Sequence, residues 1–117
     1  MSNAVVLSVN PSFEHVRVAR YTAVAVAQCL PFEPEAIDDV RVAVNELSSA
    51  LIEAGAASKI QFEFGHVRGV FVAEGSATVR TPPQLSEIAL QLLDTVVDGF
   101  ELSEAEGQAH FRATKRA

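Results

Sequence analysis

The stretch from Pro34 to Gly55, PEAIDDVRVAVNELSSALIEAG, predicts the long helix around which the fold is built. Proline at a first-turn position and the neighbouring acidic residues favour a helix start, and Gly55 is a typical residue just beyond a helix end. At ~1.5 Å per residue this helix is about 30 Å long, enough to cross a small domain. Its apolar face is formed by Val40, Ala43, Val44, Leu47, Ala50, Leu51 and Ala54.

A strand and a second helix are predicted before this stretch. Val5–Val9 is short and rich in β-branched residues, and Asn10-Pro11 ends it. Ser12 is well placed as an N-cap, and the helix after it ends before Pro31. The alternation from Tyr21 to Gln28 also allows a strand, but the helical period covers the whole segment and is preferred. That period is carried by Val16, Ala19, Ala23, Val26 and Leu30.

After Gly55 the pattern changes to the period of two that is typical of strands. Ile60, Phe62 and Phe64 alternate with polar residues, Gly65–Gly69 is read as a turn, and Val70–Ala73 returns as the second strand of a hairpin. Ala77–Val79 could extend that strand. Pro82-Pro83 ends this part of the chain.

The last third of the chain predicts one amphipathic helix and two strands. The helix covers Gln84 to Thr95, and strands over Val96–Leu102 and Gln108–Thr114 meet at Gly107. The element order is therefore β-α-α-β-β-α-β-β. We predict an α+β fold with a single domain over residues 1–117, a two-layer sandwich in which three helices cover one face of a mostly antiparallel sheet.

Composition narrows the range of functions. Hydrophobic residues make up 49% of the 117 residues, which excludes a disordered chain, and the net charge of −6 argues against direct binding of nucleic acid. No apolar run is long enough to span a membrane, and no signal peptide is recognised at the N-terminus. The single cysteine, Cys29, fits a reducing cytoplasm, and an acidic surface suits a basic protein partner.

Motifs for metal, nucleophilic or phosphate chemistry are weak. The three histidines and Cys29 fall on separate elements without ligand spacing, so we predict no metal site. Ser48-Ser49 lacks the glycines of a nucleophile elbow, and neither glycine-rich phosphate pattern is present. Asp39, Glu46 and Glu53 recur every seven residues beside the apolar helix face. They are interpreted as the solvated border of that helix, with Glu46 as a candidate general base in the alternative interpretation.

The segment Asp38–Ile52, DDVRVAVNELSSALI, resembles the N-box helix of the anti-sigma-factor serine kinases, which belong to the histidine-kinase-like (Bergerat) ATPase superfamily. Val5–Val9 followed by Pro11 resembles the first strand of that family. Gln91–Asp98 is similar to its last helix running into a strand, and Gly107–Lys115 to its closing strand. The element order agrees over nearly the whole chain, and the resemblance implies the family fold.

The resemblance also implies positions for nucleotide handling, and the sequence departs from several of them. Glu46 stands at the general-base position, but the asparagine that holds Mg²⁺ in the family is replaced by Ala50. Glu74 and Gly75 fall in the region of the Asp-x-Gly-x-Gly box that reads adenine, without its second glycine. Thr81-Pro82-Pro83-Gln84 replaces the glycine-rich lid. Mg-ATP is thus the cofactor implied by the family, and these departures weigh against its use and against an enzyme.

Three hypotheses follow from the resemblance. The leading one is an anti-sigma-factor-like protein that sequesters an alternative sigma factor, with an anti-anti-sigma (STAS) protein as opposing partner and a homodimer as the working form. Glu14, Asp38 and Asp39 are its candidate contacts for a basic partner surface. The alternatives are an active ATP-dependent serine-protein kinase acting on a STAS protein with Glu46 as base, and a non-catalytic orphan dimerisation domain.

Overall fold

The computed structural model describes residues 4–117, so residues 1–3 of the domain predicted over 1–117 lie outside the described residues. Five strands and three helices follow one another in the predicted order. Their bounds are β1 (Val5–Val9), α1 (Phe13–Ala27), α2 (Pro34–Glu53), β2 (Ile60–Val67), β3 (Val70–Thr78), α3 (Glu87–Val96), β4 (Gly99–Ala105) and β5 (Gln108–Arg116). The predicted α+β sandwich is confirmed.

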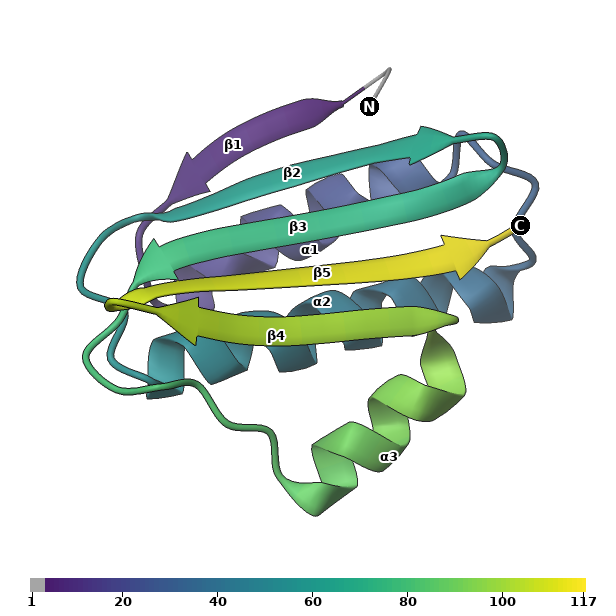
Figure 1. Cartoon of the computed structure of the whole chain (residues 1–117). Coiled ribbons are helices and arrows are strands. Elements are labelled where there is room, and N and C mark those ends of the chain that lie inside the picture. The colour runs from purple at the N-terminus through teal and green to yellow at the C-terminus, as the bar shows by residue number, and fades with distance from the viewer. Residues whose placement is uncertain (1–3) are drawn as a thin grey trace.

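The strands form one sheet in the order β1-β2-β3-β5-β4, and every neighbouring pair is antiparallel. β5, the last strand along the chain, therefore lies between β3 and β4. Helices α1 and α2 lie side by side against one face of this sheet (Figure 1), while α3 packs on α2 below the β4 edge. The third helix thus completes the helical layer at its border.

Local capping explains where the helices begin. The Ser12 hydroxyl accepts a hydrogen bond from the backbone N–H of His15 at 3.3 Å, and α1 continues without interruption through Tyr21. The predicted helix is confirmed there, and the alternative strand over Tyr21–Gln28 is wrong. Ser86 caps α3 by accepting from the N–H of Ala89 at 3.1 Å. Because this cap fixes the first turn, α3 begins at Glu87 and not at Gln84.

Several predicted strand limits are wrong by a few residues. β2 continues through Gly65 to Val67, so the hairpin turn is confined to Arg68 and Gly69, both with positive φ (51° and 77°). β3 is a single strand from Val70 to Thr78. At the other end of the chain α3 runs on to Val96, which delays β4 to Gly99, and β5 extends to Arg116.

The core between the layers depends on one glycine in the centre of the sheet. The register places Phe62, Gly75 and Phe111 side by side on β2, β3 and β5, facing the helices. The two phenylalanine rings lean together over the glycine, with centroids 6.2 Å apart in an edge-to-face arrangement. A Cβ at position 75 would lie only 2.3 Å from the Phe111 ring. Gly75 is therefore required by the aromatic packing.

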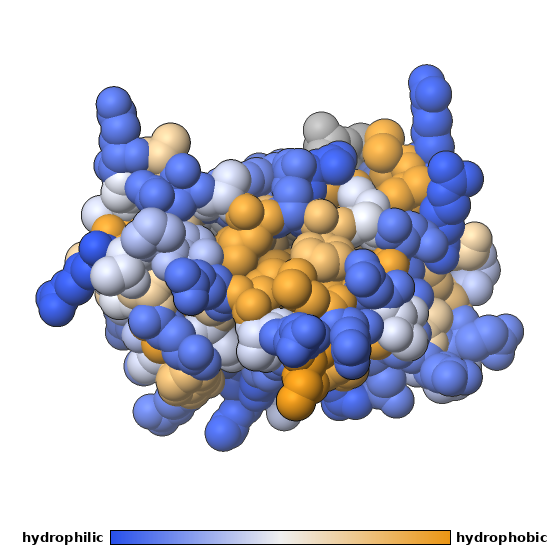
Figure 2. Space-filling view, turned by 60° about the horizontal axis from the view of Figure 1, so that its bottom comes forward, coloured by the Kyte–Doolittle hydropathy of each residue, from blue (hydrophilic) through white to orange (hydrophobic). Residues whose placement is uncertain are grey.

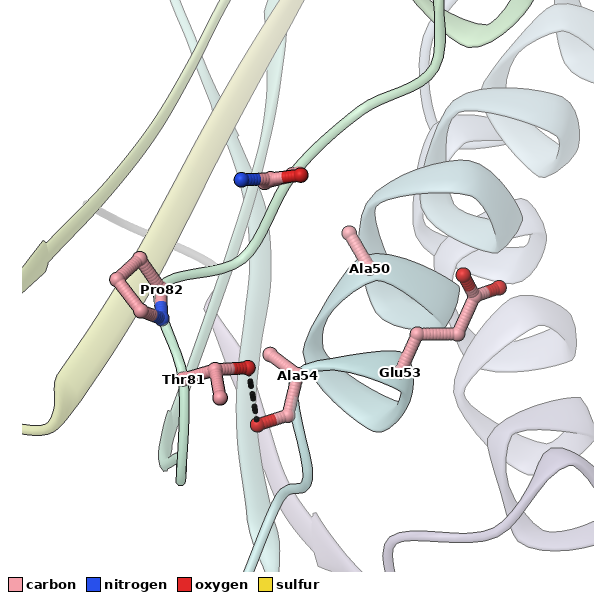
Figure 3. A pocket seen from close by; sticks show the side chains of 6 residues that line it. Ala50, Glu53, Ala54, Thr81 and Pro82 are labelled. Atoms are coloured by element: carbon pink, nitrogen blue, oxygen red, sulfur yellow. Dashed lines mark hydrogen bonds between the residues drawn. The ribbon is translucent and has the colours of Figure 1, made fainter.

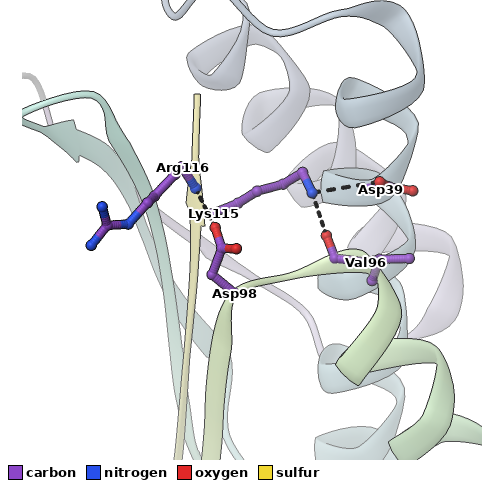
Figure 4. Close-up of polar contacts among 5 residues, drawn as sticks. All are labelled: Asp39, Val96, Asp98, Lys115 and Arg116. Carbon is purple, nitrogen blue, oxygen red and sulfur yellow. Dashed lines mark hydrogen bonds and ion pairs between the residues drawn. The ribbon is translucent and has the colours of Figure 1, made fainter.

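A polar cluster fixes the end of α3 against the rest of the fold (Figure 4). Lys115 of β5 is 15% exposed, and its Nζ donates to the carbonyl oxygen of Val96 at 2.7 Å and lies 3.5 Å from Asp39 Oδ2. Asp98 accepts from the backbone N–H of Arg116 at 2.6 Å. One lysine thus ties β5, α2 and the C-terminal end of α3 together.

Over the described residues 4–117, no helix is long and apolar enough to cross a membrane.

Candidate functional site

A hollow lies between the C-terminal half of α2 and the segment that connects β3 to α3. Its first part has a volume of about 300 Å3 (Figure 3). This part is lined by Ala50, Glu53 and Ala54 from the α2 side and by Thr81, Pro82 and Gln84 from the connection. A second part of about 180 Å3 adjoins it and shares Ala50, Glu53 and Gln84. This second part is completed by Glu46, Ser49, Leu85, Ser86 and Ala89. The two parts together are named the α2 hollow.

The connection is held against the end of α2 by backbone hydrogen bonds. The N–H groups of Arg80 and Thr81 both donate to the carbonyl oxygen of Ala54 at 3.0 Å, and the Thr81 hydroxyl donates to the same oxygen at 3.3 Å. Ala54 is the C-cap of α2, so these donors satisfy a carbonyl group that the helix leaves without an internal partner. The wall of the hollow is therefore anchored at its base.

Two of the family-derived positions meet in this hollow. Glu46 and Ala50 are one helical turn apart on α2, and both line its second part. The Glu46 carboxylate is half-buried and accepts a hydrogen bond from the Asn45 amide at 3.4 Å. The Asn45 carbonyl oxygen in turn accepts from Arg20 Nη1 of α1 at 2.5 Å. The candidate general base is thus one end of a polar chain that joins α2 to α1.

The charge of the hollow does not fit a magnesium nucleotide. Its ionisable side chains are the carboxylates of Glu46 and Glu53, and in the part of the chain that the structure describes no lysine or arginine lines it. Two carboxylates repel a polyphosphate that no cationic side chain offsets. Ala50 supplies no oxygen for Mg²⁺, which requires oxygen ligands. Within residues 4–117, no group of three or more His, Cys, Asp or Glu is placed to hold a metal ion.

Glu74 and Gly75, the other positions assigned to the nucleotide site, lie elsewhere. Glu74 sits on β3 between residues whose side of the strand faces the helices, so its own side chain lies on the opposite face of the sheet. There its Oε1 is 3.1 Å from His110 Nε2. The structure therefore does not bring Glu74 together with Glu46, and it gives Gly75 a packing role under Phe111.

The three candidate partner contacts have different surroundings. Glu14 is exposed in the first turn of α1. Asp38 is exposed and forms an ion pair with Arg41 one turn later on α2, while Asp39 is paired with Lys115. Asp38 and Asp39 are thus engaged within the molecule, and contact of the three carboxylates with a partner stays a prediction.

Sequence reasoning did not assign Glu53, Thr81 and Gln84 to a common site. Glu53 had a signal, because it shares the seven-residue spacing of Asp39 and Glu46 on α2. Thr81 and Gln84 belong to the segment Thr81–Gln84, which stands where the family has its glycine-rich lid. That correspondence was the signal that could have assigned both residues to the α2 hollow.

The chain thus forms a five-stranded antiparallel sheet with a layer of helices on one face and a hollow beside α2. A solved structure of similar fold is that of the RsbU and RsbW domains of Rv1364c from Mycobacterium tuberculosis. The TM-score is 0.78 at 14% sequence identity over 98% of this chain, which spans 32% of the other. No protein-family model and no curated protein matches the sequence. The fold expected from the resemblance is confirmed.

Proposed function

We propose that this chain is an anti-sigma-factor-like regulator that sequesters a sigma factor by protein–protein binding without nucleotide chemistry. The observation that carries the proposal is the charge of the α2 hollow, which is lined by two carboxylates and, among residues 4–117, by no lysine or arginine. Ala50, which the family resemblance sets against the Mg²⁺-binding asparagine, lines it as well. The fold similarity to a structure that contains an RsbW domain supports the class of regulator.

Exposed apolar side chains support binding to another protein. α3 presents Ile88, Leu90 and Leu92 to solvent, although buried residues of the same helix already pack on α2. Figure 2 shows apolar side chains gathered around a depression on the side of the molecule where α3 and β4 lie. Apolar side chains gathered on one exposed face are typical of interaction surfaces.

The remaining features of the proposal follow from the family resemblance. A STAS-type protein would compete with the sigma factor, the working form would be a homodimer, and both partners would be met in the cytoplasm. Release would then depend on which partner buries more complementary surface.

The test is capture of native partners by the tagged chain, with and without Mg-ATP, followed by binding of the purified candidate to the purified chain. Equal recovery of a sigma factor under both conditions supports the proposal, and recovery of only the chain itself contradicts it in favour of the orphan dimerisation domain. A recovery that depends on Mg-ATP contradicts the claim that nucleotide is not used.

One observation favours the kinase as a second candidate, because Glu46 does line the hollow. Phosphate transfer from ATP to a co-captured STAS protein tests this directly. A kinase would lose that transfer in Glu46→Gln and keep it in Glu35→Gln, a matched change at an exposed position in the first turn of the same helix. We expect no transfer with either variant or with the unchanged chain.

A further inference from the structure

A groove of about 430 Å3 spans the three helices and is separate from the α2 hollow except at Glu46, which lines both. Arg20 and Tyr21 of α1 form one wall, Val42 and Asn45 of α2 form the floor, and Leu92 of α3 forms the other wall. We name this feature the three-helix groove. Its walls belong to helices that are distant in the sequence, so it exists only in the folded chain.

Both walls expose large apolar side chains. Tyr21 is 63% exposed, and Val18 lies one turn before it on the same face of α1. Leu92 is 38% exposed, and Ile88 lies one turn before it on α3 with 72% of its surface exposed. Two apolar stripes on either side of a groove are what an amphipathic helix needs to insert the residues of its apolar face.

The polar groups of the groove have a positive excess although the chain carries a net charge of −6. Arg20 and Arg41 line it, and Arg17 is exposed one turn before Tyr21. Glu46 is the carboxylate that lines the groove, and Asp38 is the ion-pair partner of Arg41. Glu14 lies farther along α1, one turn before Val18. Asn45 holds the Arg20 guanidinium through one of its five N–H donors, which fixes its position at the wall.

We propose that the three-helix groove binds an acidic amphipathic helix of a partner protein. Leucine-like side chains of that helix pack between Tyr21 and Leu92, and its flanking carboxylates pair with Arg20 and Arg17. Arginine and carboxylate match in geometry as well as in charge. The inference deepens the proposed function by naming a contact surface, and it rests on that function only in taking the partner to be a protein.

The experiment measures binding of labelled synthetic peptides to the purified chain by fluorescence anisotropy. One peptide of about four helical turns carries leucine at positions i, i+3, i+4 and i+7 with glutamate elsewhere. A second carries lysine in place of every glutamate, and a third has the acidic composition with its leucines scrambled. The variants are Tyr21→Ala, Leu92→Ala and Arg20→Gln, with Val67→Ala as the control at an exposed apolar side chain of the β2–β3 hairpin.

We expect the acidic amphipathic peptide to bind and the other two to bind at least about tenfold more weakly, a difference of 1.4 kcal/mol. Tyr21→Ala and Leu92→Ala each weaken binding about tenfold, whereas Val67→Ala leaves the affinity unchanged. Arg20→Gln reduces the salt dependence of binding. Circular dichroism confirms that each variant is folded. The proposal is overturned if the acidic peptide does not bind at about 1 mM, if the lysine peptide binds equally well, or if neither wall variant weakens binding.

The two proposals fail in different ways. If the acidic peptide binds but no sigma factor is captured, the groove assignment stands and the regulatory function is wrong. If a sigma factor is captured equally by the unchanged chain, Tyr21→Ala and Leu92→Ala, the function stands and the groove assignment is wrong.

Discussion

Gly75→Ala is the substitution for which the structure gives the sharpest expectation. The new Cβ would stand 2.3, 2.6 and 3.0 Å from three carbons of the Phe111 ring, where ordinary contact begins at 3.4 Å. The ring must therefore retreat by about 1 Å, but Phe111 is fully buried and its ring meets Phe62 edge-on. Forced overpacking of this kind costs about 1–3 kcal/mol of unfolding free energy, and we expect the upper end of that range here.

The assay is equilibrium unfolding in urea, followed by far-UV circular dichroism, on a double-mutant cycle. Phe111→Leu removes ring atoms that the new methyl would meet, so the double variant should be more stable than the sum of the two single losses by about 1–2 kcal/mol. Gly99→Ala is the matched control, because a Cβ there meets only the Thr114 hydroxyl at 3.3 Å. A neutral Gly75→Ala, or strict additivity with Phe111→Leu, would refute the packing role of this glycine.

Three further substitutions test other parts of the fold by the same unfolding assay. Ser48 is fully buried in α2, and its hydroxyl has no hydrogen-bond partner among the described residues. Ser48→Ala should therefore raise the free energy of unfolding by about 1 kcal/mol, whereas the control Ser49→Ala, at a half-buried position, should change it by less than about 0.5 kcal/mol. Lys115→Met removes the lysine that holds the end of α3. It should lower the free energy of unfolding by about 2 kcal/mol and speed amide hydrogen exchange in the last turn of α3. The control Arg116→Met, at an exposed position, should change neither the stability nor the exchange rate. Gly55→Ala should cost about 1–2 kcal/mol, because Gly55 has φ 79° and a Cβ there would lie 3.1 Å from Arg80; equal stability would show that the backbone relaxes.

The periodic parts of the fold could be predicted because burial repeats with the geometry of each element. The apolar face of α2 and the alternation of Ile60, Phe62 and Phe64 are examples, and both are confirmed. The limits of α3 and β4 could not be predicted well, because the Ser86 cap and the Lys115 contacts decide them. Capping and long-range contacts leave little trace in a local pattern.

The site was predictable only where its residues share one helix. Glu46 and Ala50 fall together because an interval of four residues places them on one face of α2. Glu74 was assigned to the same site by motif position, but the alternation of β3 turns its side chain to the other face of the sheet. The three-helix groove combines residues from α1, α2 and α3, and nothing in the sequence indicated which faces of these helices would meet.

The strand order has a consequence for the path by which the molecule assembles. β1, β2 and β3 can pair as soon as they are synthesised, but β4 leaves the ribosome with no neighbour, because β5 must insert between it and β3. β5 also carries Phe111, the partner of Phe62 in the core, and Lys115, which anchors α3. The sheet and the attachment of α3 are therefore completed only when β5 pairs with β3 and β4. We expect the nascent chain to remain accessible to chaperones and proteases until β5 is out, and then to close in one cooperative step.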